Sequence, residues 1–277
     1  MSTAISICHG QFGRATLYQL NRPFITHVHR EGHLIFLIDG ADSKVTVSGE
    51  PQNVRADSAV AVNPWEPHAF HPGDRRDGSI FLTMYIKPIW FLEVGRSAKS
   101  ALRFGRSAIE MTPQISHSVQ KVVTLLLEFS DTDLFDGYLY ELTKECFDQS
   151  WQWTPTARPF ANEFSMFTDF RVRKSMKLMS EHLGTDLELN EIARESGLSR
   201  PHFYKLFRKQ TGITPNLFMN TLRMERAIEW LSESDKSITD IGYDLGFSCQ
   251  SGFSRFFSTN VGMPPTDYRR VVHMVGN

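Results

Sequence analysis

Two stretches near the C-terminus, residues 188–215 and 237–265, repeat the same order of residue types, and this repeat constrains the fold more than any other feature. Each copy predicts a helix, a short turn containing Gly and a second helix, the outline of a helix-turn-helix DNA-binding motif. With one extra residue in the second copy, the matched pairs are Ile192 and Ile241, Gly197 and Gly246, Ser199 and Ser248, Phe203 and Phe253, Phe207 and Phe257, Gly212 and Gly262, and Pro215 and Pro265.

The second predicted helix of the first copy has an apolar side and a basic side. Ser199 is a suitable N-cap, and Pro201 suits the first turn. Phe203, Leu206 and Phe207 share the apolar side. The other side carries Arg200, Pro201, Tyr204, Lys205 and Arg208. This basic and aromatic side suits a major groove lined by phosphates.

The corresponding helix of the second copy has a more selective outward side. Its expected buried residues are Phe253, Phe256 and Phe257. Its outward residues are Gln250, Ser251, Ser254 and Arg255. Gln pairs with adenine edges and Arg with guanine edges. A predicted helix over residues 214–232 would separate the two reading helices by about one DNA turn, roughly 34 Å.

A plain helical bundle with a solvated basic face is the alternative, and the matched turns and buried positions of two copies argue against it. Residues 167–272 resemble the DNA-binding domain of the AraC/XylS family of bacterial transcription regulators, with the signature over residues 238–268. The resemblance implies base-reading positions at Pro201, Tyr204, Lys205, Gln250, Ser251, Ser254 and Arg255. Pro201 departs from the larger or polar residue usual there, which favours backbone contact by the first copy. The resemblance also implies a contact of Asp240 with the RNA polymerase sigma subunit.

The first half of the chain has a strand pattern. Residues 10–87 alternate apolar and polar side chains with frequent turns, which predicts a small barrel or sandwich. From Pro88 the period becomes helical, with helices expected from Pro113 and over 134–151. These helices either only cover the barrel or also form a homodimer contact. Residues 152–165 contain Pro155 and Pro159 and predict a linker.

Histidines cluster in the strand region. His27 and His29 would face the same side of a strand, and His33 and His68 follow. The arrangement is similar to the cupin barrel, whose metal motif is His-x-His-x3-Glu-x6-Gly with a later His; His33 stands in place of the Glu. The similarity implies a divalent metal held by His27, His29, His33 and His68, since imidazoles suit Zn, Cu, Fe or Ni. The alternative is a metal-free pocket in which these histidines contact an organic effector.

Two neighbouring segments extend the expected effector site. Trp65 lies in the turn before His68. Arg75 and Arg76 lie beside a Gly turn, where they either hold a phosphate or carboxylate of the effector or form a solvated hairpin.

Composition and charge limit the classes of protein to which the chain can belong. Net charge is −1, divided into −3 for residues 1–164 and +2 for residues 165–277, too small an excess to indicate DNA binding by itself. Three scattered Cys residues and an N-terminus unlike a signal peptide favour a cytoplasmic protein without disulfides. No apolar run approaches the roughly 20 residues of a membrane span.

The sequence therefore predicts an α+β protein in three parts. Residues 1–151 form a cupin-like effector-binding and dimerisation domain, 152–165 a linker, and 166–277 a double helix-turn-helix domain. The protein is expected to be an effector-controlled transcription regulator that binds double-stranded DNA. We expect it to activate rather than repress transcription, and not to be an enzyme. Two alternatives stay open: a dioxygenase-like cupin metalloenzyme fused to a DNA-binding domain, and a DNA-binding protein whose first domain only dimerises.

Overall fold

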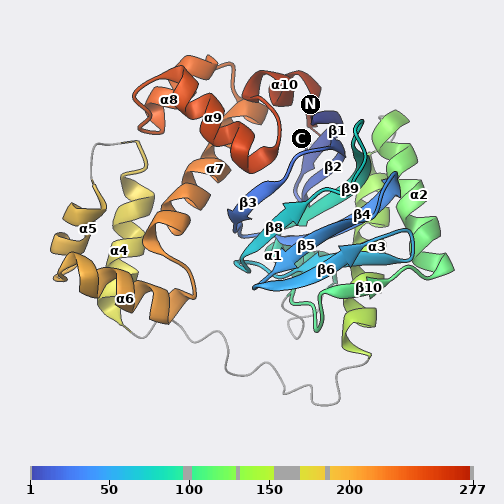
Figure 1. The fold of residues 1–277 in the computed structure, drawn as a ribbon, viewed down its shortest axis with the longest axis horizontal. Helices are drawn as coiled ribbons and strands as arrows, with labels where there is room; N and C mark the ends of the chain where they lie inside the picture. Colours follow the sequence, from blue (N-terminus) through green and yellow to red (C-terminus); the bar gives the residue numbers. More distant parts are fainter. Residues whose placement is uncertain (1, 96–101, 129–131, 153–168, 185–187, 275–277) are drawn as a thin grey trace. The chain divides into compact units, whose positions relative to one another are not determined.

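The computed structural model describes residues 2–95, 102–128, 132–152, 169–184 and 188–274 (Figure 1). The chain divides into a sheet unit, Met1–Ala157 with Ser258–Asn277, and a helical unit, Arg158–Phe257. This mixed architecture confirms the expected α+β class. Within the described ranges, every helix is too short or too polar to cross a membrane.

The sheet unit contains a seven-stranded sheet in the order β10-β7-β4-β9-β2-β1-β11 and a four-stranded sheet in the order β3-β8-β5-β6. The frequent turns predicted from the sequence connect short strands that pair mainly in antiparallel fashion, and β1 with β11 is a parallel pair. The strands are β1 (Thr3–Gly10), β2 (Gly13–Leu20), β3 (Phe24–His27), β4 (Gly32–Asp39), β5 (Ser43–Val47), β6 (Glu50–Val54), β7 (Ser58–Val62), β8 (His68–His71), β9 (Ser79–Ile86), β10 (Ala108–Glu110) and β11 (Val272–Met274).

Helices cover one side of the larger sheet and complete its core. They are α1 (Pro88–Gly95), α2 (Pro113–Glu128) and α3 (Thr132–Trp151). One side of α2 is buried at Val119, Val122 and Leu126, which recur at the 3.6-residue period of a helix. The predictions of a helix starting at Pro113 and of a second helix ending at Trp151 are confirmed.

The helical unit and the repeat have the predicted order of helices. They are α4 (Phe170–Glu181), α5 (Leu189–Glu195), α6 (Arg200–Thr211), α7 (Pro215–Glu233), α8 (Ile238–Asp244) and α9 (Gln250–Val261), the last of which ends in the sheet unit. The single helix expected over 214–232 is α7.

The two copies of the repeat also share backbone conformation and core positions. Gly197 and Gly246 have φ of 73° and 80°, and Gly212 and Gly262 have φ of 76° and 85°. These left-handed conformations explain the repeated glycines, because a side chain there is strained. The four matched phenylalanines are 0% exposed: Phe203, Phe207, Phe253 and Phe257.

The C-terminal end differs from the expected continuous helical domain. After α10 (Pro265–Val271), residues Val272–Met274 form β11, which pairs with β1 from Ile7↔Val272 onward. Residues 258–277 therefore group with the sheet unit, although the sequence assigned all of 166–277 to one helical domain. Helical periodicity could not predict this pairing, because a three-residue strand carries no period of its own. The predicted linker lies outside the described residues apart from Gln152.

Candidate DNA-reading helices and histidine site

The outward side of α6 is positively charged. Arg200, Lys205 and Arg208 are exposed with Pro201, and Tyr204 is half-buried. The Arg200 guanidinium lies 5.8 Å from the centroid of the Tyr204 ring, a cation–π arrangement that holds both on one side of the helix. Ser199 occupies the N-cap as predicted, but its side chain makes no cap hydrogen bond.

The outward side of α9 carries a single basic residue among polar ones. Gln250, Ser251 and Arg255 are exposed, and Ser254 is half-buried. The Thr239 hydroxyl donates to Oε1 of Gln250 at 2.8 Å, which ties the start of α9 to α8 and orients the amide. The two helices therefore differ in charge as the sequence predicted.

Asp240 lies in the first turn of α8 and is exposed. Its backbone N–H donates to the Ser237 hydroxyl at 3.0 Å, and that hydroxyl donates to Oδ2 of Asp240 at 2.7 Å. This reciprocal cap gives Asp240 a structural role in α8.

The four predicted histidines come together at one end of the sheets. His27 ends β3 and pairs with His68 of β8, while His33 lies in β4. His29 is not on the strand, contrary to the expectation, because β3 ends two residues earlier. Its ring nevertheless lies 4.8 Å from the His68 ring and 5.0 Å from the His33 ring, measured between centroids.

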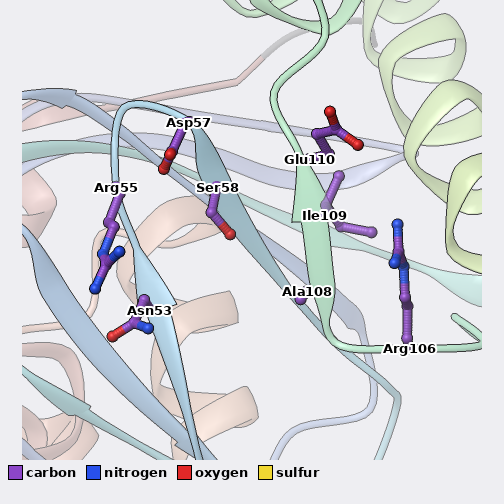
Figure 2. Close-up of a pocket in the computed structure, with 8 residues that line it drawn as sticks. All are labelled: Asn53, Arg55, Asp57, Ser58, Arg106, Ala108, Ile109 and Glu110. Atoms are coloured by element: carbon purple, nitrogen blue, oxygen red, sulfur yellow. The ribbon is translucent and has the colours of Figure 1, made fainter.

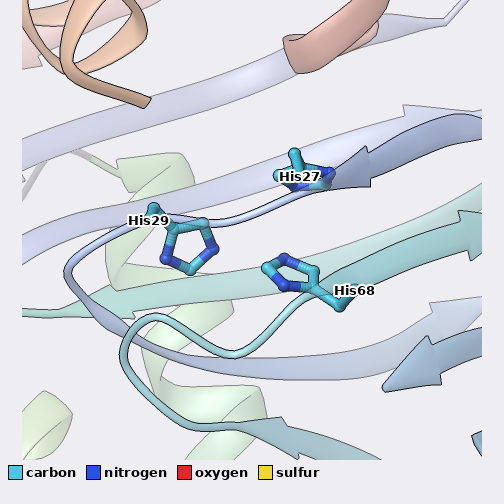
Figure 3. A group of neighbouring side chains, drawn as sticks. All are labelled: His27, His29 and His68. Atoms are coloured by element: carbon cyan, nitrogen blue, oxygen red, sulfur yellow. The ribbon is translucent and has the colours of Figure 1, made fainter. Parts of the chain in front are cut away.

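Three of these rings form a compact group of ligand atoms. One ring nitrogen each from His27, His29 and His68 lies within 4.8 Å of the others (Figure 3). Burial is the largest influence on all four histidines, and it lowers the pKa of His27 and holds the pKa of His29, His33 and His68 well below its usual value. The imidazoles are therefore neutral at pH 7, the form that binds transition metals.

Trp65 holds the group together through its backbone. It has a φ of 64°, a strained conformation for a non-Gly residue. Its N–H donates to the His29 carbonyl at 2.8 Å, which fastens the segment after β3 to the turn before β8. The Trp65 ring lies 5.7 Å from the Arg30 guanidinium. The predicted side-chain contact of Trp65 with an effector is untested.

Arg75 and Arg76 lie in the exposed turn between β8 and β9. Nη1 of Arg75 bonds Oδ2 of Asp39 at 2.9 Å, and the Gly78 N–H donates to the Arg75 carbonyl at 3.0 Å. These contacts fit the solvated hairpin interpretation better than effector binding.

A buried hydrogen-bonded network next to the histidines was not predicted from the sequence. The Tyr85 ring stacks on His33 at a centroid distance of 4.4 Å. The Arg14 guanidinium lies 3.7 Å from the centroid of the same Tyr85 ring. Arg14 donates to the Tyr268 hydroxyl at 3.4 Å, and that hydroxyl lies 2.7 Å from Nε2 of His9. Burial lowers the pKa of His9 to about 3, so the ring is neutral and shares a hydrogen bond with the Tyr268 hydroxyl. The histidine group is thus connected to α10.

A cavity of about 290 Å³ lies elsewhere, where β10 pairs with β7 (Figure 2). It contains none of the predicted site residues. Charged side chains of both signs line it, and one of them, Arg55, already pairs with Asp42 at 3.3 Å. The charged lining residues are Arg55, Asp57, Arg106 and Glu110.

Family models match both parts of the chain. A model described as an AraC-like ligand binding domain matches residues 14–143, and a helix-turn-helix domain model matches residues 192–271. The second match continues through α10, beyond the end of the helical unit. The solved structure of an apo ToxT variant from Vibrio cholerae has the same fold, with a TM-score of 0.64, 13% identity and coverage of 94% of this chain and 97% of ToxT.

Curated relatives are regulatory proteins. The Msm operon regulatory protein of Streptococcus mutans is 26% identical over 88% of this chain and 86% of its own length. Regulatory protein PocR of Salmonella typhimurium is 37% identical over 38% of this chain, which spans 35% of PocR. The HTH-type transcriptional activator RhaS of Klebsiella pneumoniae is 29% identical over 37% of each chain. The chain thus spans about a third of PocR and RhaS and most of the Msm regulator.

Proposed function

Because the chain belongs to the AraC family of transcription regulators, with an effector-binding domain and a helix-turn-helix domain, we propose a division of work among its sites. α6 holds the DNA backbone, α9 reads base edges, and the histidine end of the sheet unit binds the effector. The single observation that carries this proposal is the contrast between the two repeated helices. α6 exposes Arg200, Lys205 and Arg208, whereas α9 exposes Arg255 among the polar residues Gln250 and Ser251.

The charges on the two helices indicate which one contacts the DNA backbone and which one reads the bases. Each Lys or Arg beside a phosphate adds affinity that does not depend on sequence. Gln250 and Arg255, five residues apart on α9, can each hydrogen-bond base edges in patterns that differ between base pairs. We expect Pro201 to add contact area without hydrogen bonds, since its side chain has no donor.

The proposal includes a route from effector to DNA. The Tyr85 ring stacks on His33 and also contacts the Arg14 guanidinium, and Arg14 bonds Tyr268 of α10. A ligand that moves His33 would act on this chain of contacts and shift the population of DNA-binding conformations. We expect activation rather than repression, the role printed in the name of the relative RhaS.

A homodimer through α2 and α3 stays a prediction. Leu127 and Leu134 on these helices are 50% and 55% exposed, and exposed large apolar side chains favour a partner surface. A monomer mass in sedimentation at micromolar concentration would contradict it. A contact of Asp240 with the sigma subunit also stays a prediction, beside its role in capping α8.

Selection of bound sequences from random double-stranded DNA tests the proposed function. We expect the full chain to enrich an asymmetric site with two segments whose centres are about 10 bp apart, one turn of the duplex. The segment contacted by α9 should be the better defined of the two. Enrichment of no sequence, at a salt concentration where the protein still binds DNA, would contradict the reading role of α9.

A further inference from the structure

The hydrogen bonds of three histidines determine which ring nitrogen is bare. Nδ1 of each ring lies at hydrogen-bond distance from a backbone carbonyl two residues away. A carbonyl only accepts, so each Nδ1 carries the proton and each neutral ring leaves Nε2 with a free lone pair. The bonds are His27 to Ile25 at 2.8 Å, His29 to Glu31 at 3.0 Å and His68 to Glu66 at 2.9 Å.

His33 cannot satisfy all three lone pairs. Its Nδ1 lies 3.2 Å from Nε2 of His29 and 3.3 Å from Nε2 of His68, so its one N–H faces two acceptors. Its own Nε2 is buried and has no hydrogen-bond partner in the described part of the chain. Four imidazoles, those of His33 and His68 buried and those of His27 and His29 half-buried, therefore present more acceptors than donors, which costs free energy unless another group supplies positive charge.

We propose that the effector of this regulator is a divalent transition-metal ion, bound by Nε2 of His27, His29 and His68. This rests on the proposed function, which assigns effector binding to the same end of the sheet unit. Neutral imidazoles suit Zn, Ni, Co and Cu ions, and three of them leave a coordination position for water. Each ring already donates its other nitrogen to a carbonyl, the arrangement that orients histidine ligands around metals.

The three histidine rings must move slightly closer together to bind one ion. Ligand nitrogens of a tetrahedral ion with bonds of about 2.05 Å lie about 3.3 Å apart. One nitrogen of each ring is already within 4.8 Å of the others, so the rings must approach by no more than about 1.5 Å.

Of the charged groups around the proposed site, one opposes the binding of a cation and another favours it. Arg14 is a buried cation, and its guanidinium lies 3.7 Å from the centroid of the Tyr85 ring, which itself stacks on His33. The Glu31 carboxylate lies 3.7 Å from Nδ1 of His29, behind the ligand, where it stabilises the positive charge that a bound ion places on the ring.

Titration of the full chain with Co²⁺ after treatment with a chelator tests the site. We expect visible absorption bands that saturate at one Co²⁺ per chain and disappear when Zn²⁺ is added. His29→Ala and His68→Ala should each weaken binding by at least about 100-fold, because each removes one of three ligands. His71→Ala is the matched control: His71 lies on β8 with His68 but is exposed and bonds Thr46, so it should bind as wild type does.

No Co²⁺ bands from folded wild-type protein, or equal affinity in wild type and His29→Ala, would overturn the proposal. If the variants do not fold, the Tm of the wild type decides: excess Zn²⁺ should raise it, and an unchanged Tm counts against the site. The affinity for selected DNA, with and without Zn²⁺, tests the effector role, and an unchanged affinity with metal bound overturns it. Failure to bind any DNA would instead contradict the proposed function and leave the metal site standing.

Discussion

Replacing Phe207 by Ala is expected to lower the free energy of unfolding by about 3–5 kcal/mol and to abolish DNA binding at 37 °C. The side chain is 0% exposed, and its ring lies 5.6 Å from the rings of both Phe203 and Phe218. Truncation leaves a cavity between α6 and α7, which the remaining rings cannot fill without moving α6. Urea unfolding followed by far-UV circular dichroism measures the loss.

The same helix supplies the control. Lys209→Ala changes an exposed residue of α6 and should alter stability by no more than about 0.5 kcal/mol. Phe257→Ala removes the matching residue of the second copy, also 0% exposed, and should cost a similar amount. A loss below about 1 kcal/mol for Phe207→Ala would show that the ring is not part of the core.

Gly262→Ala should destabilise the protein more than Gly212→Ala, although the two positions match in the repeat. Both have left-handed backbones, with φ of 85° and 76°, and an Ala there costs about 1–2 kcal/mol. A Cβ at Gly212 meets nothing within 4 Å, whereas a Cβ at Gly262 would lie 2.3 Å from the Phe24 ring of β3. Overpacking of this kind adds about 1–3 kcal/mol.

A double-mutant cycle isolates the second effect. Combining Phe24→Ala with Gly262→Ala removes the collision, so the coupling free energy should be about as large as the overpacking cost of about 1–3 kcal/mol. Phe24→Ala with Gly212→Ala should be additive within about 0.5 kcal/mol. Equal losses for the two single glycine variants would mean that the segment after α9 does not pack on β3.

The sequence predicted the features that depend on a regular spacing of residues along the chain. The repeated glycines and phenylalanines predicted two helix pairs, because turn geometry and helical period act on residues close together in the chain. For the histidine group, strand alternation placed only His27 and His29 on one side, and the similarity to the cupin motif added His33 and His68. His29 lies beyond the end of β3, and the hydrogen bond from the Trp65 N–H to its carbonyl and the contact of its Nε2 with Nδ1 of His33 help to keep it in the group.

Contacts between distant residues could not be predicted. Arg14 and Tyr268 are separated by most of the chain, and no period of either segment identifies the other as its partner. β11 likewise depends on the free edge of β1, which exists only after the sheet has formed. Sequence patterns show which side of an element is buried, but the partner that buries it is determined by tertiary packing.

The most direct test of the proposed division of work compares two variants on a selected site and on random DNA. Arg255→Ala should weaken specific binding by about 1–3 kcal/mol, relax base choice beside α9 and leave binding to random DNA nearly unchanged. Arg208→Ala, the control on α6, should weaken both kinds of binding equally and reduce the salt dependence by about one phosphate contact. Equal losses on both DNAs for Arg255→Ala would contradict the account.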